Sequence, residues 1–253
     1  MPPLFVDGVE IASVFVDGVE QQNVFADGVE VFTSFSGEDY NDTFQGSGQT
    51  RNVAMDSGQF WSVLQSTPTQ PVHQAGVWGA VGSRVSNIHN ENGTETTQEI
   101  QPIVSIINPS FVASASFSWS PPTAIANFTG ITLGSASRTD LRCDGIIGNY
   151  TIQLIINDVL DEFVDVPFID VVQCDLAMYY DGIDVAATVT ARDSIGGVFN
   201  YTFTRRSAQG TFTVNGRTYL NAILPLFAFI FMDAEIYNVQ ELGIPPGDIP
   251  WPT

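Results

Sequence analysis

The sequence predicts an all-β protein, in which a short N-terminal β-hairpin repeat segment precedes one or two β-sandwich domains. The 18 Phe, 7 Tyr and 4 Trp, together with many Val, Ile and Thr, favour strands over helices. The 22 Gly and 14 Pro are spread along the chain, as is typical of short strands joined by turns. With 253 residues and 44% apolar content, the chain is long enough to build one large core or two smaller ones.

The first thirty residues contain one seven-residue pattern three times, at a spacing of ten: aliphatic, Phe, Val or Ala, Asp, Gly, Val, Glu. This period is too short for a helical repeat, and Asp-Gly suits the two central positions of a type I′ turn. We expect three equivalent hairpins that bury their apolar residues against copies of themselves or against other chains. The predicted assembly residues are Phe5, Asp7, Gly8, Val9, Phe15, Asp17, Gly18, Val19, Phe25, Asp27, Gly28 and Val29.

Changes in composition divide the chain into five segments. They are the ten-residue repeats (1–35), a linker and β-rich region (36–98), a sandwich (99–175), a second β-rich region (176–243) and an extended Pro-rich tail (244–253). In the tail, Trp251 is flanked by prolines, and we predict that it is an exposed anchor on a neighbouring subunit. The clearest strands are predicted at 103–107, 111–119, 150–156, 185–191, 199–203 and 211–214.

The charge balance excludes several partners. Asp and Glu number 28 against 8 basic residues, all of them Arg, which gives a net charge of −20. Such a chain repels nucleic-acid phosphates and anionic membrane surfaces, so neither is an expected partner. The acidic excess fits a solubilising surface, and cation uptake between packed subunits or adaptation to high salt stay open as alternatives.

The two cysteines, Cys143 and Cys174, suit either one disulfide or two buried thiols. With no CxxC element and only His73 and His89 as histidines, we predict no metal site. The N-terminus lacks the features of a signal peptide, and the apolar stretch 222–232 is too short to span a bilayer.

No motif of a hydrolase, a phosphate-binding loop or a dinucleotide-binding protein occurs, so we predict no enzyme activity, no catalytic residues and no cofactor. A glycan hydrolase that uses two carboxylates is the weakest alternative. The densest acidic stretch, 158–175, offers oxygen ligands for Ca²⁺, but it lacks EF-hand spacing, and outward-facing carboxylates on a strand explain it better.

Three segments resemble the core-Trp strand and later strands of immunoglobulin-like modules of the PKD or bacterial type. They are Phe117-Ser118-Trp119, residues 148–158 and residues 184–194. The two cysteines depart from the family pattern, because they do not occupy the positions of the inter-sheet pair in antibody domains. The resemblance implies an Ig-like sandwich, and such modules are frequent in bacteriophage tail, fibre and capsid-surface proteins.

Together these features predict an acidic, oligomeric structural component of a bacteriophage virion: a capsid decoration, fibre or tail protein. Its expected partners are other virion proteins and copies of itself, and its expected location is the virion. The alternative function is that of a receptor- or glycan-binding adhesion protein, in which exposed aromatic residues recognise a host-surface glycan.

Overall fold

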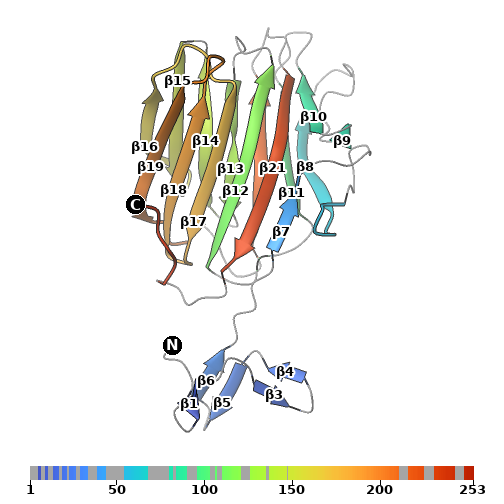
Figure 1. Cartoon of the computed structure of the whole chain (residues 1–253), viewed down its shortest axis with the longest axis vertical. Helices are drawn as coiled ribbons and strands as arrows, with labels where there is room; N and C mark the ends of the chain where they lie inside the picture. Colours follow the sequence, from blue (N-terminus) through green and yellow to red (C-terminus); the bar gives the residue numbers. More distant parts are fainter. Residues whose placement is uncertain are drawn as a thin grey trace.

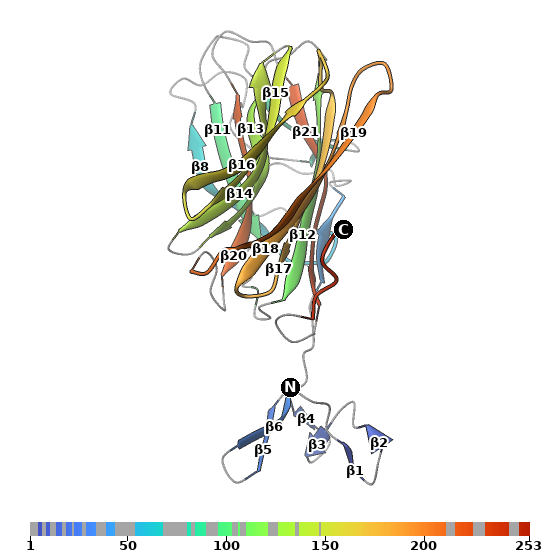
Figure 2. The ribbon, with the colours of Figure 1, turned by 90° about the vertical axis from the view of Figure 1, so that its left-hand side faces the viewer.

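The protein is a two-layered β-sandwich, as shown by a computed structural model (Figures 1 and 2). The structure describes strands between residues 5 and 33, and residues 39–43, 54–67, 80–81, 84–89, 96–102, 106, 110–120, 126–134, 137–146, 148–210, 216–224, 231–242 and 248–253. In this part of the chain every regular element is a strand, and no helix is long and apolar enough to cross a membrane. The prediction of an all-β sandwich is confirmed.

The first layer, here called sheet 1, has eight described strands. From edge to edge they are β19 (Val198–Ser207), β18 (Asp184–Arg192), β17 (Gln173–Tyr180), β12 (Phe111–Ser120), β21 (Phe231–Glu241), β10 (Arg84–His89) and β9 (Ala80–Val81). The eighth strand, β7 (Asp39–Asp42), pairs with the second half of β21, whereas β10 pairs with its first half. Sheet 1 is the layer nearest the viewer in Figure 1.

The second layer, sheet 2, has seven described strands. They are β16 (Val159–Val166), β15 (Asn149–Ile156), β14 (Arg138–Ile146), β13 (Ala126–Gly134), β20 (Arg217–Leu224), β11 (Thr96–Pro102) and β8 (Trp61–Thr67). Every pairing in both sheets is antiparallel, and β12 pairs with β21 across more than a hundred residues of sequence. The sandwich is therefore held together by contacts between distant segments.

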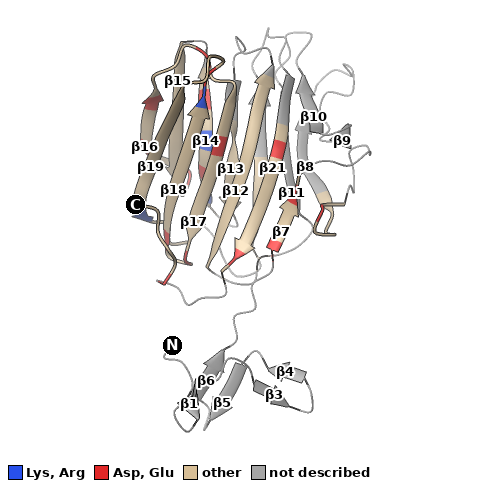
Figure 3. Cartoon of the chain, in the orientation of Figure 1, with Lys and Arg blue, Asp and Glu red and all other residues tan. Residues whose placement is uncertain are grey.

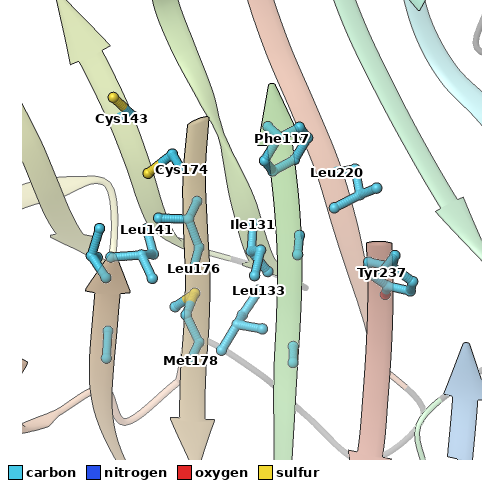
Figure 4. Packing of buried hydrophobic residues seen from close by; sticks show 14 of the residues in the cluster. Phe117, Ile131, Leu133, Leu141, Cys143, Cys174, Leu176, Met178, Leu220 and Tyr237 are labelled. Atoms are coloured by element: carbon cyan, nitrogen blue, oxygen red, sulfur yellow. The ribbon is translucent and has the colours of Figure 1, made fainter. Parts of the chain in front are cut away.

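The core lies between the sheets and follows from the alternation of side chains along each strand. In β17 the buried residues are Cys174, Leu176, Met178 and Tyr180, and the residues between them are partly exposed. The facing layer contributes Ile131, Leu133 and Leu141, among others (Figure 4). Phe117 and Trp119 are also buried, so the predicted core position of this Trp is confirmed.

The immunoglobulin-like resemblance is not confirmed. Two of its motif segments form β12 and β15, which lie in different sheets of a sandwich with more strands than the seven to nine of an Ig domain. The sheets also run across the boundary drawn at 175/176, because this boundary falls inside β17.

Predicted and observed strands agree best in the middle of the chain. The predictions at 111–119, 150–156, 185–191 and 199–203 correspond to β12, β15, β18 and β19. In the segment predicted at 103–107, the described residues show only an isolated bridge between Ile106 and Gly216. The strand predicted at 211–214 lies outside the described residues.

The N-terminal repeats contain three strand pairs, each a separate two-stranded sheet. They are β1 (Phe5–Val6) with β2 (Val9–Glu10), β3 (Val14–Val16) with β4 (Val19–Gln21), and β5 (Asn23–Ala26) with β6 (Val29–Thr33). In every pair two residues separate the innermost partners, such as Val6 and Val9 in the first. The three units thus have the same register at their innermost partners, and the third has a register shift between Val24 and Phe25. In Figure 1 they lie outside the two sheets.

Candidate functional site

A hollow of about 480 Å³ lies on the outer face of sheet 1, over β12, β17, β18 and β21. Side chains point into it because alternate residues of a strand face outward when their neighbours fill the core. In β17 the outward residues are Gln173, Asp175 and Ala177. The outward residues that line the hollow are Ser114, Ser116, Gln173, Asp175, Ala177, Thr188, Thr190, Glu235 and Ile236.

Strand register brings the polar residues of the hollow into rows. Ser116 lies opposite Asp175, and Asp175 in turn lies opposite Thr190. On the other side of Ser116, β21 contributes Ile236. Directly opposed side chains in adjacent antiparallel strands are close enough to interact, so each row acts as a unit.

Asp175 is the centre of a hydrogen-bond network. Its Oδ1 accepts a hydrogen bond from the Ser116 hydroxyl at 2.5 Å and another from the Gln173 amide at 3.2 Å. The same amide also donates to Ser116 Oγ at 3.2 Å. The other carboxylate oxygen, Oδ2, forms an ion pair with Arg192. The network fixes the orientation of the carboxylate, and the Asp175 side chain stays 35% exposed.

A β-bulge shapes the wall of the hollow. In the pairing of β12 with β21, Ser116 opposes Ile236 but Phe117 opposes Ala234, so Glu235 is an extra residue. Both Glu235 and Ile236 therefore lie on the outer face, between the buried Ala234 and Tyr237. Glu235 accepts a hydrogen bond from the Ser118 hydroxyl at 2.8 Å, and the Ile236 side chain is 50% exposed.

The floor of the hollow is open because its side chains are small. Ser114 lies opposite Ala177, and Ala177 lies opposite Thr188. Two residues further along β17, Tyr179 lies on the same face of the strand. The site thus combines a fixed carboxylate, hydroxyl and amide groups with apolar surface, which suits a ligand with hydroxyl groups on a carbon skeleton.

Sequence reasoning did not single out this hollow, although Asp175 belongs to the acidic stretch that it noted. The available signal is the alternation in β12 of small hydroxyl residues with apolar ones, seen at Ser114, Ser116 and Ser118. This alternation indicates a polar face without bulky side chains. The bulge at Glu235 has no comparable signature.

The predicted assembly residues are placed only in part. Phe5, Val9, Phe15, Val19, Phe25 and Val29 belong to the paired strands of the repeats, and the six Asp and Gly positions (Asp7, Gly8, Asp17, Gly18, Asp27 and Gly28) lie outside the described residues. Their role in assembly stays a prediction.

Trp251, the predicted partner anchor, contacts its own chain. The Arg205 guanidinium lies 4.7 Å from the centre of its ring. Arg205 also forms an ion pair with Asp184 at 2.5 Å and one with the buried Asp181 at 3.4 Å. In the described part of the tail, Trp251 is therefore packed on the sandwich near β18 and β19, and an additional contact of Trp251 with a neighbouring subunit stays a prediction.

The acidic stretch is explained largely by turn geometry and ion pairs. Asn157 and Asp158 have φ of 53° and 64°, so they form the left-handed connection between β15 and β16. Arg206 forms ion pairs with Asp161 at 3.3 Å and with Glu162 at 2.9 Å. Within the described ranges, no group of three or more His, Cys, Asp or Glu is arranged to hold a metal ion.

Acidic residues also dominate the charged positions that the structure describes (Figure 3). Near the hollow, Arg192 forms an ion pair with Asp175. This pair lowers the negative charge of the site within a chain whose net charge is −20. Anionic ligands meet long-range repulsion, whereas neutral ligands do not.

No protein-family model matches the sequence, and no curated protein is similar to it. The fold, by contrast, is shared with solved structures. A CBM2 module of the evolved Dit protein of Lactobacillus casei BL23 phage J-1 covers 82% of this chain and 97% of its own, with a TM-score of 0.50 and 9% identity.

Two lectins are similar in the same way. Lectin UEA-II complexed with galactose covers 83% of this chain and 100% of its own, with a TM-score of 0.52 and 10% identity. Peanut lectin with a 9-residue peptide covers 81% and 97%, with a TM-score of 0.51 and 9% identity. At such identities the likeness establishes a common sandwich fold and nothing more specific.

Proposed function

We propose that this chain is a glycan-binding protein that recognises neutral saccharides through the hollow on the outer face of sheet 1. The observation that carries the proposal is the Asp175 network, which holds acceptor and donor groups in fixed positions above a floor of small side chains. Saccharide hydroxyls need such preorganised hydrogen-bonding groups, and saccharide C–H faces need apolar surface such as that of Ile236. The sandwich fold that the chain shares with lectins and a CBM2 module supports this function.

The ligand is uncharged, because the net charge of −20 opposes sialylated, sulfated or phosphate-bearing glycans. A glycan array probed with the full chain tests this directly. We expect binding to a set of neutral saccharides that is unchanged at higher salt, since the recognition depends on short-range hydrogen bonds.

The variant Asp175→Asn locates the site. Loss of the carboxylate removes the ion pair with Arg192 and a strong acceptor, so glycan affinity falls at least about tenfold. The matched control is Asp184→Asn, which removes an ion-paired carboxylate of the same sheet outside the hollow. Equal losses in both variants, or no saccharide signal for the parent protein, contradict the proposal.

A second function, assembly into a bacteriophage particle, is proposed for the N-terminal segment. The three strand pairs share the register of their innermost partners and form no sheet with the described sandwich strands. They are suited to contact equivalent sites on symmetric partners. The similar module of a phage Dit protein supports this setting. Deletion of residues 1–32 is expected to abolish incorporation into particles or oligomers while glycan binding persists; normal assembly of the truncated chain would refute it.

A further inference from the structure

The two cysteines of the chain lie on opposite layers of the sandwich. Cys143 belongs to β14 in sheet 2, and Cys174 belongs to β17 in sheet 1. Both side chains are fully buried, and both thiols are free (Figure 4). Between them in the sequence lie β15 and β16, which also belong to sheet 2. The two cysteines therefore stand at the two ends of the chain segment that passes from sheet 2 to sheet 1.

The two thiols are neighbours in the core (Figure 4). The Cys143 side chain is the largest single influence on the pKa of the Cys174 thiol. In register with Cys174, Ala191 places only a methyl group on the same inward face, which leaves room for close approach of the sheets. The neighbouring Cys143 side chain and complete burial hold the pKa of the Cys174 thiol well above its ordinary value. In the closed fold the thiol is therefore protonated and unreactive.

We propose that Cys143 and Cys174 form a disulfide that joins the two sheets when the protein folds or opens in the presence of a small-molecule disulfide such as oxidised glutathione. The site is thus an oxidative modification site in the core of the sandwich.

The reaction balances through two thiol–disulfide exchanges. One cysteine, as its thiolate, attacks a sulfur of oxidised glutathione, which forms a mixed disulfide and releases one reduced glutathione. The second cysteine then displaces the other glutathione as a second thiol. Two S–H bonds are lost and one S–S bond forms; the two protein sulfurs supply two electrons, and each glutathione leaves with one proton.

Burial determines when this happens. A glutathione molecule cannot reach a sulfur that is fully enclosed, so the first exchange requires local opening or takes place during folding. Once formed, the disulfide restricts the unfolded chain and is itself protected from reductants. We expect the protein to be folded both with two free thiols and with the disulfide, and to be much more resistant to heat in the disulfide form.

The test is refolding of the full chain in a glutathione redox buffer, followed by mass spectrometry and a thiol assay under denaturing conditions. We expect a monomer that is about 2 Da lighter and has no titratable thiol, since two hydrogen atoms are lost. Its Tm should be about 10 °C higher than that of the reduced protein. Reduction of the unfolded chain should return both thiols and the lower Tm.

The single variants Cys143→Ala and Cys174→Ala are the controls. Each should gain at most one glutathione adduct and show no rise in Tm under the same oxidation. The proposal is overturned if the parent protein refolds to its native circular dichroism spectrum with two free thiols, or if its cysteines pair only between chains. Because the glycan array does not depend on either cysteine, failure here leaves the proposed function untouched.

Discussion

The outer faces of the two sheets carry similar polar networks but differ in shape. On sheet 2, Gln153 accepts from Arg142 at 3.0 and 3.2 Å and donates to Asp144 at 3.2 Å. On sheet 1, Gln173 donates to Ser116 and Asp175 in a comparable ladder. In both cases a glutamine donates a hydrogen bond to an aspartate, and on sheet 2 the glutamine also accepts from an arginine of the neighbouring strand.

The difference lies in the side chains between the polar groups. On sheet 2 a Cβ atom at Gly130 would lie 2.8 Å from the Cβ of Arg142 and 2.2 Å from the carbonyl oxygen of Leu141, so this position is already filled. On sheet 1 the corresponding floor of Ser114 and Ala177 leaves a hollow. Similar polar alternation therefore produces a closed face in one sheet and a candidate binding face in the other.

Burial affects the charged side chains on the outer face of sheet 2, whereas Asp175 on sheet 1 is partly exposed. The pKa of Asp140, on the outer face of sheet 2, is raised chiefly by burial, and its Oδ1 is buried without a hydrogen-bond partner among the described residues. Burial also raises the pKa of Asp144 and lowers that of Arg142. The charges of sheet 2 are thus held at a cost in stability, whereas Asp175 on sheet 1 stays accessible to a ligand.

The largest expected effect is a loss of stability when a side chain is added at Gly130 on the outer face of sheet 2. Gly130→Ala adds a methyl group where backbone atoms leave no space, so the strands must shift. We expect a loss of about 1–3 kcal/mol in the free energy of unfolding. Urea denaturation measures it, with Ser114→Ala on the open face as a control expected to change stability little. Equal stability of the two variants would contradict the contrast between the faces.

The two glutamines separate structure from binding. Gln153→Ala should lower the free energy of unfolding by about 1 kcal/mol, because Arg142 and Asp144 lose their shared partner, and should leave glycan affinity unchanged. Gln173→Ala should instead weaken glycan binding several-fold, because it supports Asp175. Urea denaturation measures the stability of both variants, and titration calorimetry measures their glycan affinity. A loss of glycan affinity in Gln153→Ala would contradict this prediction.

The smallest effect concerns the pH dependence of stability. The pKa of Asp140 in the folded protein lies above its unfolded value of 3.8, so the favourable contribution of the neutral acid is present below pH 3.8 and is lost as pH rises through the folded pKa. Asp140→Asn should therefore raise Tm by a few degrees at pH 7 and change it little at about pH 3. A lower Tm of the variant at pH 7 would show that ion pairing outweighs burial.

Local patterns in the sequence were sufficient for much of the fold. Alternating residues in 111–119 and 150–156 predict β12 and β15 because side-chain period depends on the strand itself. The sequence could not show that the sandwich has more strands than an Ig domain. That number depends on which distant strands pair, as β12 does with β21. Cys143 and Cys174 are neighbours for the same reason, since their strands lie in different sheets that pack together.

The candidate site shows the same division. Outward Ser114, Ser116 and Asp175 follow from alternation once their strands are known. The hollow itself requires the bulge that turns Glu235 and Ile236 to one face, and it requires the neighbouring floor to come from Ala177 in another strand. Neither fact is encoded within one segment, so the site became visible only in the assembled sheet.

Filling the hollow and then measuring glycan affinity shows whether the outer face of sheet 1 binds the saccharide. Ala177→Trp places a large side chain on the floor, and Val159→Trp, at a 66% exposed position of β16 in sheet 2, adds the same side chain elsewhere. With both variants folded, we expect a loss of at least about tenfold in affinity for the array-identified saccharide in Ala177→Trp and parent-like affinity in Val159→Trp. Unchanged binding in Ala177→Trp would show that the outer face of sheet 1 is not the glycan site.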